Sequence, residues 1–411
     1  MTNSVIATLI RGFCIDLTGK PQTVIFEKWE KEAPNTALKP EINLNDSEEA
    51  AVSVIRNSYK AWKKNNFAAD GKIALPSCVA LTTNGKIEAL LWIGSDFDSA
   101  QKRRAEKDAS PIIETFVQRD VSCSEVSLAV INAEERANVV KNKITLVTGG
   151  AQGIGEEIVR NLAAAGAFVF IADLNLEGAK KLAQQINDKE KRTAASGIQV
   201  NVSNEESVEA MFSAVTEMTG GFDLCVSNAG VLKAGSVLEQ ELSDFKFVTD
   251  INYTGFFVIC KFAGRILRAQ HSAAPFWKTD IIQVNSKSGL EGSNKNGAYS
   301  GGKFGGLGLV ASFAMELVEY GIKVNAVCPG NFLDGPLWSD PEKGLFVQYL
   351  RTGKVPGAKT IADVRAFYEA KVPMKRGCTG KDLVRAIYYI VEQEYETGQA
   401  VPVTGGQIML H

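Results

Sequence analysis

The sequence predicts a doubly wound α/β domain with a parallel sheet, preceded by a smaller α+β domain. From residue 144 onward, short apolar segments alternate with longer amphipathic ones, a pattern typical of parallel strands joined by helices. Before that point strand and helix patterns are mixed, and the segment 133–143 is polar and charged. A chain of 411 residues suits two domains. We therefore expect an N-terminal domain over residues 1–140 and a second domain over 141–411.

The first domain is expected to combine strands and helices. Strands are predicted at 5–17, 23–26, 79–83 and 86–93, and the last two flank Asn84-Gly85, a strong hairpin signal. Helices are predicted at 47–64, with Asp46 or Ser47 as N-cap, and from 98 to about 107. In the second domain, strands are predicted at 144–147, 168–172, 224–226, 281–284 and 323–327, and a helix at 156–165.

Composition excludes several classes of protein. The net charge of −2 gives no field that would attract nucleic acid, and no apolar run is long enough to span a membrane. The first residues lack a secretory signal pattern, and the seven scattered cysteines form no Cys-x-x-Cys pair, so we expect a cytoplasmic protein with reduced thiols. Only two histidines occur, His271 (expected on a surface loop) and His411, which argues against a metal site or a Ser-His-Asp triad.

A glycine-rich turn follows the strand predicted at 144–147. It contains Gly149, Gln152, Gly153, Ile154 and Gly155 and opens the predicted helix, which would bring backbone N–H groups close to a pyrophosphate. Asp173 ends the next strand, where a carboxylate can accept both hydroxyls of an adenosine ribose and would repel a 2′-phosphate. This pattern favours NAD over NADP.

Tyr299 and Lys303 lie four residues apart, hence on one helical face. Tyr59 and Lys63 have the same spacing without supporting context, and we expect them on the surface of a helix. Tyr299, by contrast, belongs to a series of further motifs that lie at the ends of predicted strands or between them. They are Asn228-Ala229-Gly230, Asn252, Ser286 and Pro329-Gly330.

In this order the motifs resemble the short-chain dehydrogenase/reductase family over about two-thirds of the chain, including a closing strand near 395–406. The resemblance implies a Rossmann fold, a catalytic tetrad and a homodimer or homotetramer. The tetrad is Asn252, Ser286, Tyr299 and Lys303. The cofactor contacts that it implies beyond the glycine-rich turn and Asp173 are Asn201, Val202, Asn228, Ala229, Gly230, Tyr299, Lys303, Pro329, Gly330 and Asn331. Asn201 departs from the aspartate that many relatives carry.

The chemistry of these side chains is consistent with alcohol oxidation. A phenol has a pKa of about 10, and a neighbouring Lys303 ammonium together with the positive nicotinamide favours the phenolate. Tyr299 would then take the alcohol proton while hydride leaves the carbon, and Ser286 would stabilise charge on the same oxygen. Asn252 would hold a water that links Lys303 to solvent.

Two segments, 285–289 and 371–378, resemble the sorbitol-6-phosphate dehydrogenases of this family. Substrate contacts are expected from Ser286, Lys287 and Tyr299. The long insert 331–376 holds eight Lys/Arg against five Asp/Glu, which would suit an anionic polyol phosphate if the charges do not simply face solvent. The alternatives are a ketoreductase of an uncharged or acyl-carrier substrate and a non-catalytic NAD sensor.

Two further features stay open at this stage. The helix that carries Tyr299 contains Gly301, Gly302, Gly305, Gly306 and Gly308, which indicates a close approach by a partner helix or the cofactor. No motif in the N-terminal domain indicates a family. It has no histidine and therefore cannot be a zinc aldolase, so oligomerisation or regulation is the default expectation.

Overall fold

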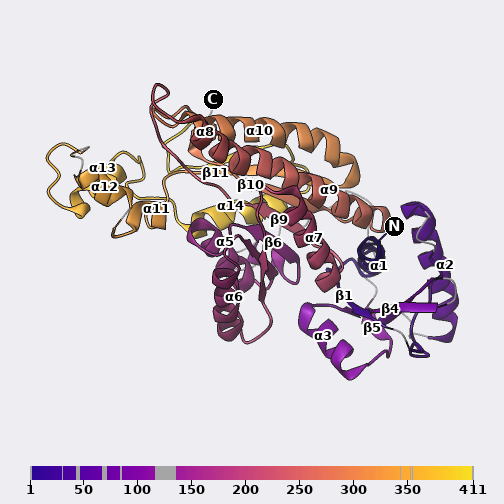
Figure 1. Ribbon diagram of the computed structural model, residues 1–411. Helices are drawn as coiled ribbons and strands as arrows, with labels where there is room; N and C mark the ends of the chain where they lie inside the picture. Colours follow the sequence, from indigo (N-terminus) through magenta and orange to yellow (C-terminus); the bar gives the residue numbers. More distant parts are fainter. Residues whose placement is uncertain are drawn as a thin grey trace.

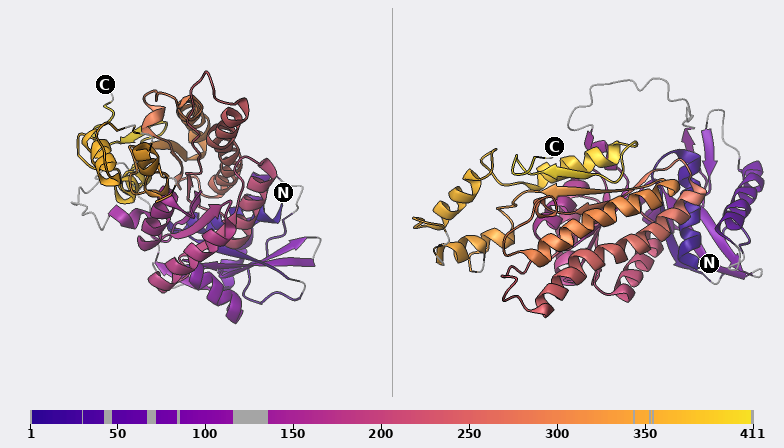
Figure 2. Two further views of the ribbon diagram at one scale, coloured as in Figure 1. Left: turned by 60° about the vertical axis from the view of Figure 1, so that its left-hand side comes forward. Right: turned by 90° about the horizontal axis from the view of Figure 1, so that it is seen from above.

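A computed structural model describes residues 2–29, 31–42, 47–66, 72–83, 86–115, 136–342, 344–351, 353 and 355–409. A large sheet with helices on both faces forms the centre of the molecule (Figure 1). The N-terminal unit, defined here as residues 2–115, lies at one end, and the insert 331–376 projects from the opposite end (Figure 2). The predicted boundary near residue 140 follows a segment, 116–135, that lies outside the described residues.

The large sheet has seven strands, all paired in parallel. Their spatial order is β12-β11-β10-β9-β6-β7-β8, so the order reverses direction between β6 and β9. This arrangement confirms the predicted doubly wound fold. The bounds are β6 Ile144–Thr148, β7 Phe168–Asp173, β8 Ala195–Gln199, β9 Leu224–Ser227, β10 Thr279–Val284, β11 Ile322–Pro329 and β12 Ala400–Val403.

Helices cover the two faces of this sheet because each buries one apolar stripe against it. One face packs against α5 (Gly153–Ala164), α6 (Leu176–Glu190) and α14 (Gly380–Glu392). The other packs against α7 (Glu205–Thr219), α9 (Gly255–Ala273) and α10 (Gly297–Leu317). The remaining elements of this part are η1 Asn138–Val140, α8 Leu242–Thr249, η2 Asp250–Thr254, η3 Lys287–Gly289 and η4 Val318–Tyr320.

The N-terminal unit contains a three-stranded antiparallel sheet and a two-stranded one, with orders β1-β4-β3 and β2-β5. Its strands are β1 Thr23–Lys28, β2 Lys72–Leu75, β3 Cys78–Thr83, β4 Lys86–Gly94 and β5 Ile112–Thr115. Its helices are α1 Asn3–Thr18, α2 Glu48–Asn65, which Ser47 caps, and α3 Phe97–Glu106. The predicted hairpin strands pair as expected, while the Asn84-Gly85 turn lies outside the described residues.

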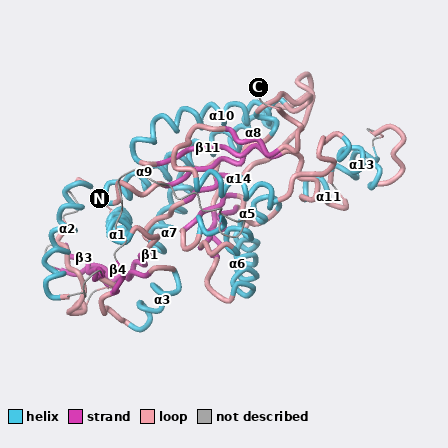
Figure 3. The backbone as a smooth tube through the Cα atoms, turned by 180° about the vertical axis from the view of Figure 1, so that it is seen from behind, coloured by secondary structure: helices cyan, strands magenta, loops and turns pink. Residues whose placement is uncertain are grey.

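The strand predicted at 5–17 is wrong, since these residues belong to α1. The helix lies against α2, α7 and α9 (Figure 3), so most of its circumference is buried and carries apolar side chains. A buried helix of this kind lacks the polar stripe that reveals a helical period, so its sequence reads like that of a buried strand.

Two smaller expectations are also wrong, one about exposure and one about secondary structure. Tyr59 is only 7% exposed, and its hydroxyl donates a hydrogen bond of 2.7 Å to the Ala74 carbonyl, so it belongs to the core of the N-terminal unit. His271 lies in the last turn of α9 and not on a loop, and its Nδ1 atom is buried. Tertiary packing thus covers Tyr59, which the local sequence leaves open to solvent, whereas His271 remains partly exposed at the end of its helix.

The insert contains three short helices, α11 Pro336–Ser339, α12 Leu345–Arg351 and α13 Ile361–Ala370. They hold together through a small apolar core of their own, centred on Leu333, Trp338 and Val364. Within the described part of the chain, no helix is long and apolar enough to cross a membrane.

Candidate active site

A cavity of about 1140 Å³ opens where the parallel strands end at their carboxyl edge. It lies beside the point at which the strand order reverses, where sheets of this kind bind their ligands. Every site residue predicted from the sequence lines this cavity except Asn252. These residues come from segments that are up to about 180 positions apart, so the fold brings together what the motifs only suggested.

The glycine-rich turn between β6 and α5 has the shape that a bound pyrophosphate requires. Gly149 has a φ of 61°, and a Cβ atom on Gly155 would lie 2.1 Å from the Gly149 carbonyl oxygen, so neither position tolerates a side chain. Gln152, the N-cap of α5, makes no side-chain capping bond, so the first N–H groups of this helix stay available to an anion. These residues therefore fit a dinucleotide.

Asp173 lies at the end of β7 with its carboxylate already oriented by backbone donors. Ala151 N donates to one oxygen at 3.0 Å and Asn175 N donates to the other at 2.9 Å. Asn201 and Val202 line the same end of the cavity. Asp173 is the only acidic residue among the described lining residues, and no Arg or Lys from this end accompanies it.

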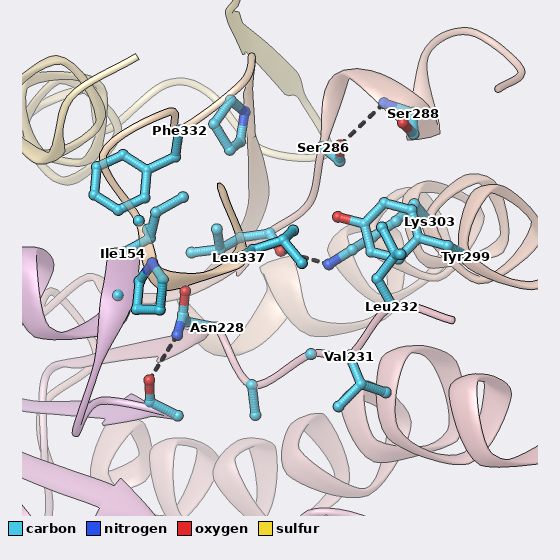
Figure 4. A pocket seen from close by; sticks show the side chains of 18 of the residues that line it. Ile154, Asn228, Val231, Leu232, Ser286, Ser288, Tyr299, Lys303, Phe332 and Leu337 are labelled. Carbon is cyan, nitrogen blue, oxygen red and sulfur yellow. Dashed lines mark hydrogen bonds between the residues drawn. The ribbon is translucent and has the colours of Figure 1, made fainter. Parts of the chain in front are cut away.

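The side chains of Ser286, Tyr299 and Lys303 converge at the other end of the cavity (Figure 4). Lys303 Nζ lies 5.6 Å from the centre of the Tyr299 ring and donates a 2.9 Å hydrogen bond to the Val284 carbonyl. Burial lowers the pKa of Lys303 to about 8, so the ammonium form still predominates at neutral pH. Burial also raises the pKa of Tyr299, against which the hydrogen bond with Ser286 acts.

Asn252 does not line the cavity; it is buried in the π-helical turn η2 between α8 and α9. Its side chain is bound to the backbone of Val231 in both directions: Val231 N donates to Oδ1 at 2.9 Å, and Nδ2 donates to the Val231 carbonyl at 2.8 Å. The side chain thus holds the loop after β9 in place. π-Helical turns inside longer helices are frequent at functional sites.

Two lysines that are close in sequence to Ser286 and Tyr299 line the cavity. Lys287 lines it as expected, and so does Lys295, which the sequence reasoning did not select. Lys295 lies on a loop, with a φ of 55°, and its carbonyl accepts a hydrogen bond from Gly235 N at 2.9 Å. Among the described residues, neither ammonium group has a carboxylate partner. A loop lysine four residues before Tyr299 carries no recognisable motif, which is why it was missed.

The insert contributes an aromatic and apolar wall to the cavity. Its lining residues are Asn331, Phe332, Gly335, Pro336, Leu337, Trp338, Leu345, Gln348 and Tyr349. None of its described basic residues lines the cavity, so the expectation of a basic insert facing an anion is not supported. Arg365 pairs with Asp334 and Glu369, and Arg376 pairs with Asp382, so both cations stabilise the fold locally.

Comparison with known proteins agrees with this geometry. A family model described as short chain dehydrogenase matches residues 143–340. Sorbitol-6-phosphate 2-dehydrogenase of Escherichia coli is 35% identical over 271 residues, which cover 65% of this chain and 99% of the relative. The chain belongs to the short-chain dehydrogenase/reductase family. As a short-chain dehydrogenase/reductase, it is an oxidoreductase that acts on CH–OH groups with NAD(P).

Two further relatives in this family carry different names and are similar to this chain over a similar length. A crystal structure of a sorbitol-6-phosphate 2-dehydrogenase from Erwinia amylovora is 38% identical, with a TM-score of 0.59, and the match covers 65% of this chain and 100% of that one. A 3-oxoacyl-[acyl-carrier-protein] reductase of Aquifex aeolicus is 28% identical over 65% of this chain and 98% of its own length. The similarity to these relatives is confined to about two-thirds of this short-chain dehydrogenase/reductase.

Proposed function

We propose that this enzyme oxidises sorbitol 6-phosphate with NAD⁺ to fructose 6-phosphate and NADH. The observation that carries the proposal is the pair of unpaired ammonium groups, Lys287 and Lys295, in the lining of the cavity. The identity of 35% to a sorbitol-6-phosphate 2-dehydrogenase adds weight to this substrate class. The proposed substrate-binding residues are Ser286, Lys287, Lys295 and Tyr299.

In the proposed mechanism Tyr299 takes the proton of the substrate hydroxyl. Bound NAD⁺ would accept hydride from the carbon that carries this hydroxyl. The Lys303 ammonium lies close enough to favour the tyrosinate, and Ser286 donates a hydrogen bond to the substrate oxygen as charge develops on it. Asn252 contributes by holding Val231, and so the wall of the site, through its two backbone hydrogen bonds.

The two cations lie on the side of the cavity away from its one lining carboxylate, which suits a bound phosphate. Asp173, the one carboxylate in the described lining, is the last residue of β7, whereas Ser286 follows β10, three strands away. At about 4.8 Å per strand the two lie about 14 Å apart across the sheet. A phosphate beside Lys287 and Lys295 therefore meets two cations and no nearby lining carboxylate.

The two lysines supply the first prediction. Charge-assisted hydrogen bonds contribute about 1.5–3 kcal/mol each, so Lys287→Met and Lys295→Met should each lower kcat/KM for sorbitol 6-phosphate by about 10- to 150-fold. Unphosphorylated sorbitol should be a poor substrate whose kcat/KM hardly changes. The measured quantity is the ratio of kcat/KM for the two substrates, since damage to neighbouring Ser286 would depress both together.

Lys381→Met is the matched control, because Lys381 is exposed on α14 and does not line the cavity. It should leave the ratio unchanged. If the parent enzyme prefers free sorbitol, or if the ratio is the same in all three variants, the phosphate proposal is wrong. The family assignment does not depend on this outcome.

The cofactor proposal, NAD rather than NADP, gives the second prediction. Because the carboxylate of Asp173 would lie next to a 2′-phosphate with no cation at that end of the lining to offset it, kcat/KM should be much higher for NAD⁺ than for NADP⁺. Asp173→Ala removes the ribose contact and should lower kcat/KM for NAD⁺ by about 10- to 150-fold, which narrows the gap. Equal use of the two cofactors by the parent enzyme would refute the assignment.

A ketoreductase of an uncharged or acyl-carrier substrate is the second candidate. The aromatic and apolar wall formed by the insert favours it, as does the similarity to 3-oxoacyl-[acyl-carrier-protein] reductases. Reduction of neutral ketones faster than fructose 6-phosphate would select this candidate. A non-catalytic NAD sensor would bind NADH and turn over neither class of substrate.

A further inference from the structure

A buried polar connection joins the end of β10 to the middle of α10. It consists of the side chains of Gln283 and Asn285, which are 2% and 3% exposed. The strand leads directly into Ser286, and the helix carries Tyr299 and Lys303. The two amides therefore lie between the elements that supply the two sides of the proposed site.

Asn285 uses its whole side-chain amide on these elements. Its Nδ2 group donates to Gln283 Oε1 at 2.7 Å and to the Lys303 carbonyl at 2.9 Å. Its Oδ1 atom accepts from Ser286 N at 2.8 Å. One buried side chain thus binds the backbone of Ser286 and that of Lys303 at the same time.

Two glycines leave the room that these amides occupy. A Cβ atom on Gly289 would lie 2.1 Å from Asn285 Oδ1, and one on Gly306 would lie 2.6 Å from Gln283 Nε2. Part of the glycine pattern in α10 therefore serves side chains of the same chain rather than a partner or a cofactor. A Cβ atom on Gly301 or Gly308, by contrast, would meet no described atom within 4 Å apart from the backbone of its own helix and its chain neighbours.

We propose that Asn285, supported by Gln283, is a positioning residue that sets the separation of Ser286 from Tyr299 and Lys303. Although Asn285 borders the cavity, both its polar groups are engaged by the protein, so it acts through its neighbours and not on the substrate. A misplacement of about 1 Å in a reacting geometry can cost about 100-fold in rate. The proposal rests on the proposed function, because it assumes that these three residues perform the chemistry.

The test variant is Asn285→Asp, which keeps the acceptor for Ser286 N but turns the donor into an oxygen facing the Lys303 carbonyl. We expect kcat to fall about 10- to 100-fold. KM for the polyol phosphate and the Kd for NADH, measured by fluorescence titration, should stay within about threefold. The pH profile of kcat should also move, because Lys303 would shift relative to the Tyr299 hydroxyl.

Asn325→Asp is the matched control. Asn325 is a buried amide (1% exposed) on the neighbouring strand β11. It binds the backbone of Glu396 and Gln399, and none of the three lines the cavity. Both variants should lose thermal stability, but only Asn285→Asp should lose kcat per folded molecule. If the aspartate variant does not fold, kcat of Asn285→Ser, whose side chain is shorter and uncharged, tests the same expectation.

Equal kcat values for folded Asn285 and Asn325 variants, or an unmoved pH profile, would overturn the proposal. Failure of the proposed function has a different signature. If Tyr299→Phe stays active, the assumed chemistry is wrong whatever Asn285 does. If Tyr299→Phe is inactive and the Asn285 variants match the control, only the positioning role is wrong.

Discussion

Tyr299→Phe should lower kcat by about 10²- to 10⁴-fold while NADH binding persists. The substitution keeps the ring and its packing but removes the only group at this position that can accept and release a proton. Because burial raises the pKa of Tyr299, the phenol depends on its neighbours to reach the charged form. The hydrogen bond with Ser286 lowers this pKa, and the nearby Lys303 ammonium would also favour the phenolate. Steady-state kinetics together with NADH fluorescence titration would separate lost chemistry from lost binding.

Tyr59→Phe is the control for this experiment, and the structure refines what it should show. The Tyr59 hydroxyl donates to the Ala74 carbonyl in the core of the N-terminal unit, so its loss should cost about 1 kcal/mol of stability and leave kcat unchanged. A Tyr299→Phe enzyme that keeps most of its rate would refute Tyr299 as the base. If Tyr59→Phe also lowered kcat, loss of rate on removing a tyrosine hydroxyl would not identify Tyr299 as the base.

The sequence was most informative where function demands particular residues at the ends of strands. Gly149, Gly155 and Asp173 were assigned because a tight turn, a helix start and a strand end leave few alternatives for a dinucleotide, and all three line the cavity. Each of these residues can be recognised from its immediate neighbours in the sequence. The parallel sheet then places them at the same edge. The strands β6, β7, β9, β10 and β11 were predicted for a similar reason, since each is a short apolar run.

Other features were hidden because they depend on tertiary packing. Strand β8, at the edge of the sheet, reads Ala-Ser-Gly-Ile-Gln and has no apolar pattern that would reveal it. Charge counting along the insert suggested a basic surface over the substrate, but pairing with Asp334, Glu369 and Asp382 uses two of those cations. Lys295, Asn285 and Gln283 could be found only once the loop and the two elements were placed beside each other.

A buried ion pair next to the first residue of β9 connects the N-terminal unit to the dehydrogenase fold. Arg11 of α1 is completely buried and lies 2.8 Å from the Asp223 carboxylate, which is also buried. Arg11 donates further hydrogen bonds to the Gln22 carbonyl at 2.7 Å and to Gln270 Oε1 at 2.5 Å. Asp223 in turn accepts hydrogen bonds from Ile144 N at 2.8 Å and from the Trp277 indole at 3.0 Å.

These contacts hold Asp223 in its charged form. Burial alone would raise the pKa of Asp223, but Arg11, Lys143 and the hydrogen bonds from Arg11 and Ile144 keep the pKa below its ordinary value. A carboxyl whose pKa is lower in the folded state adds stability at pH values above its unfolded pKa of about 3.9. That contribution disappears as the pH falls through the folded pKa, so Asp223 makes the fold sensitive to acid.

Arg11→Met should therefore lower the free energy of unfolding by about 3–5 kcal/mol at pH 7, because it leaves a buried carboxylate without its cation. Denaturant melts would measure the loss, and the acid dependence of stability should weaken, since the pKa of Asp223 would rise. The double variant Arg11→Met with Asp223→Asn should be more stable than Arg11→Met alone. This recovery would show that the unpaired charge, and not only lost packing, causes the effect.

Arg268→Met is the matched control, since the exposed Arg268–Glu48 pair, at 3.8 Å, also connects α9 to the N-terminal unit. Exposed pairs contribute about 0–1 kcal/mol, so this variant should remain close to the parent in stability. If Arg11→Met and Arg268→Met are equally mild, the N-terminal unit is only loosely attached, and a chain that begins near Asn142 should fold and turn over substrate. If Arg11→Met is severe, the same truncation should fail to fold, because it would expose both Asp223 and the α9 face that α1 covers.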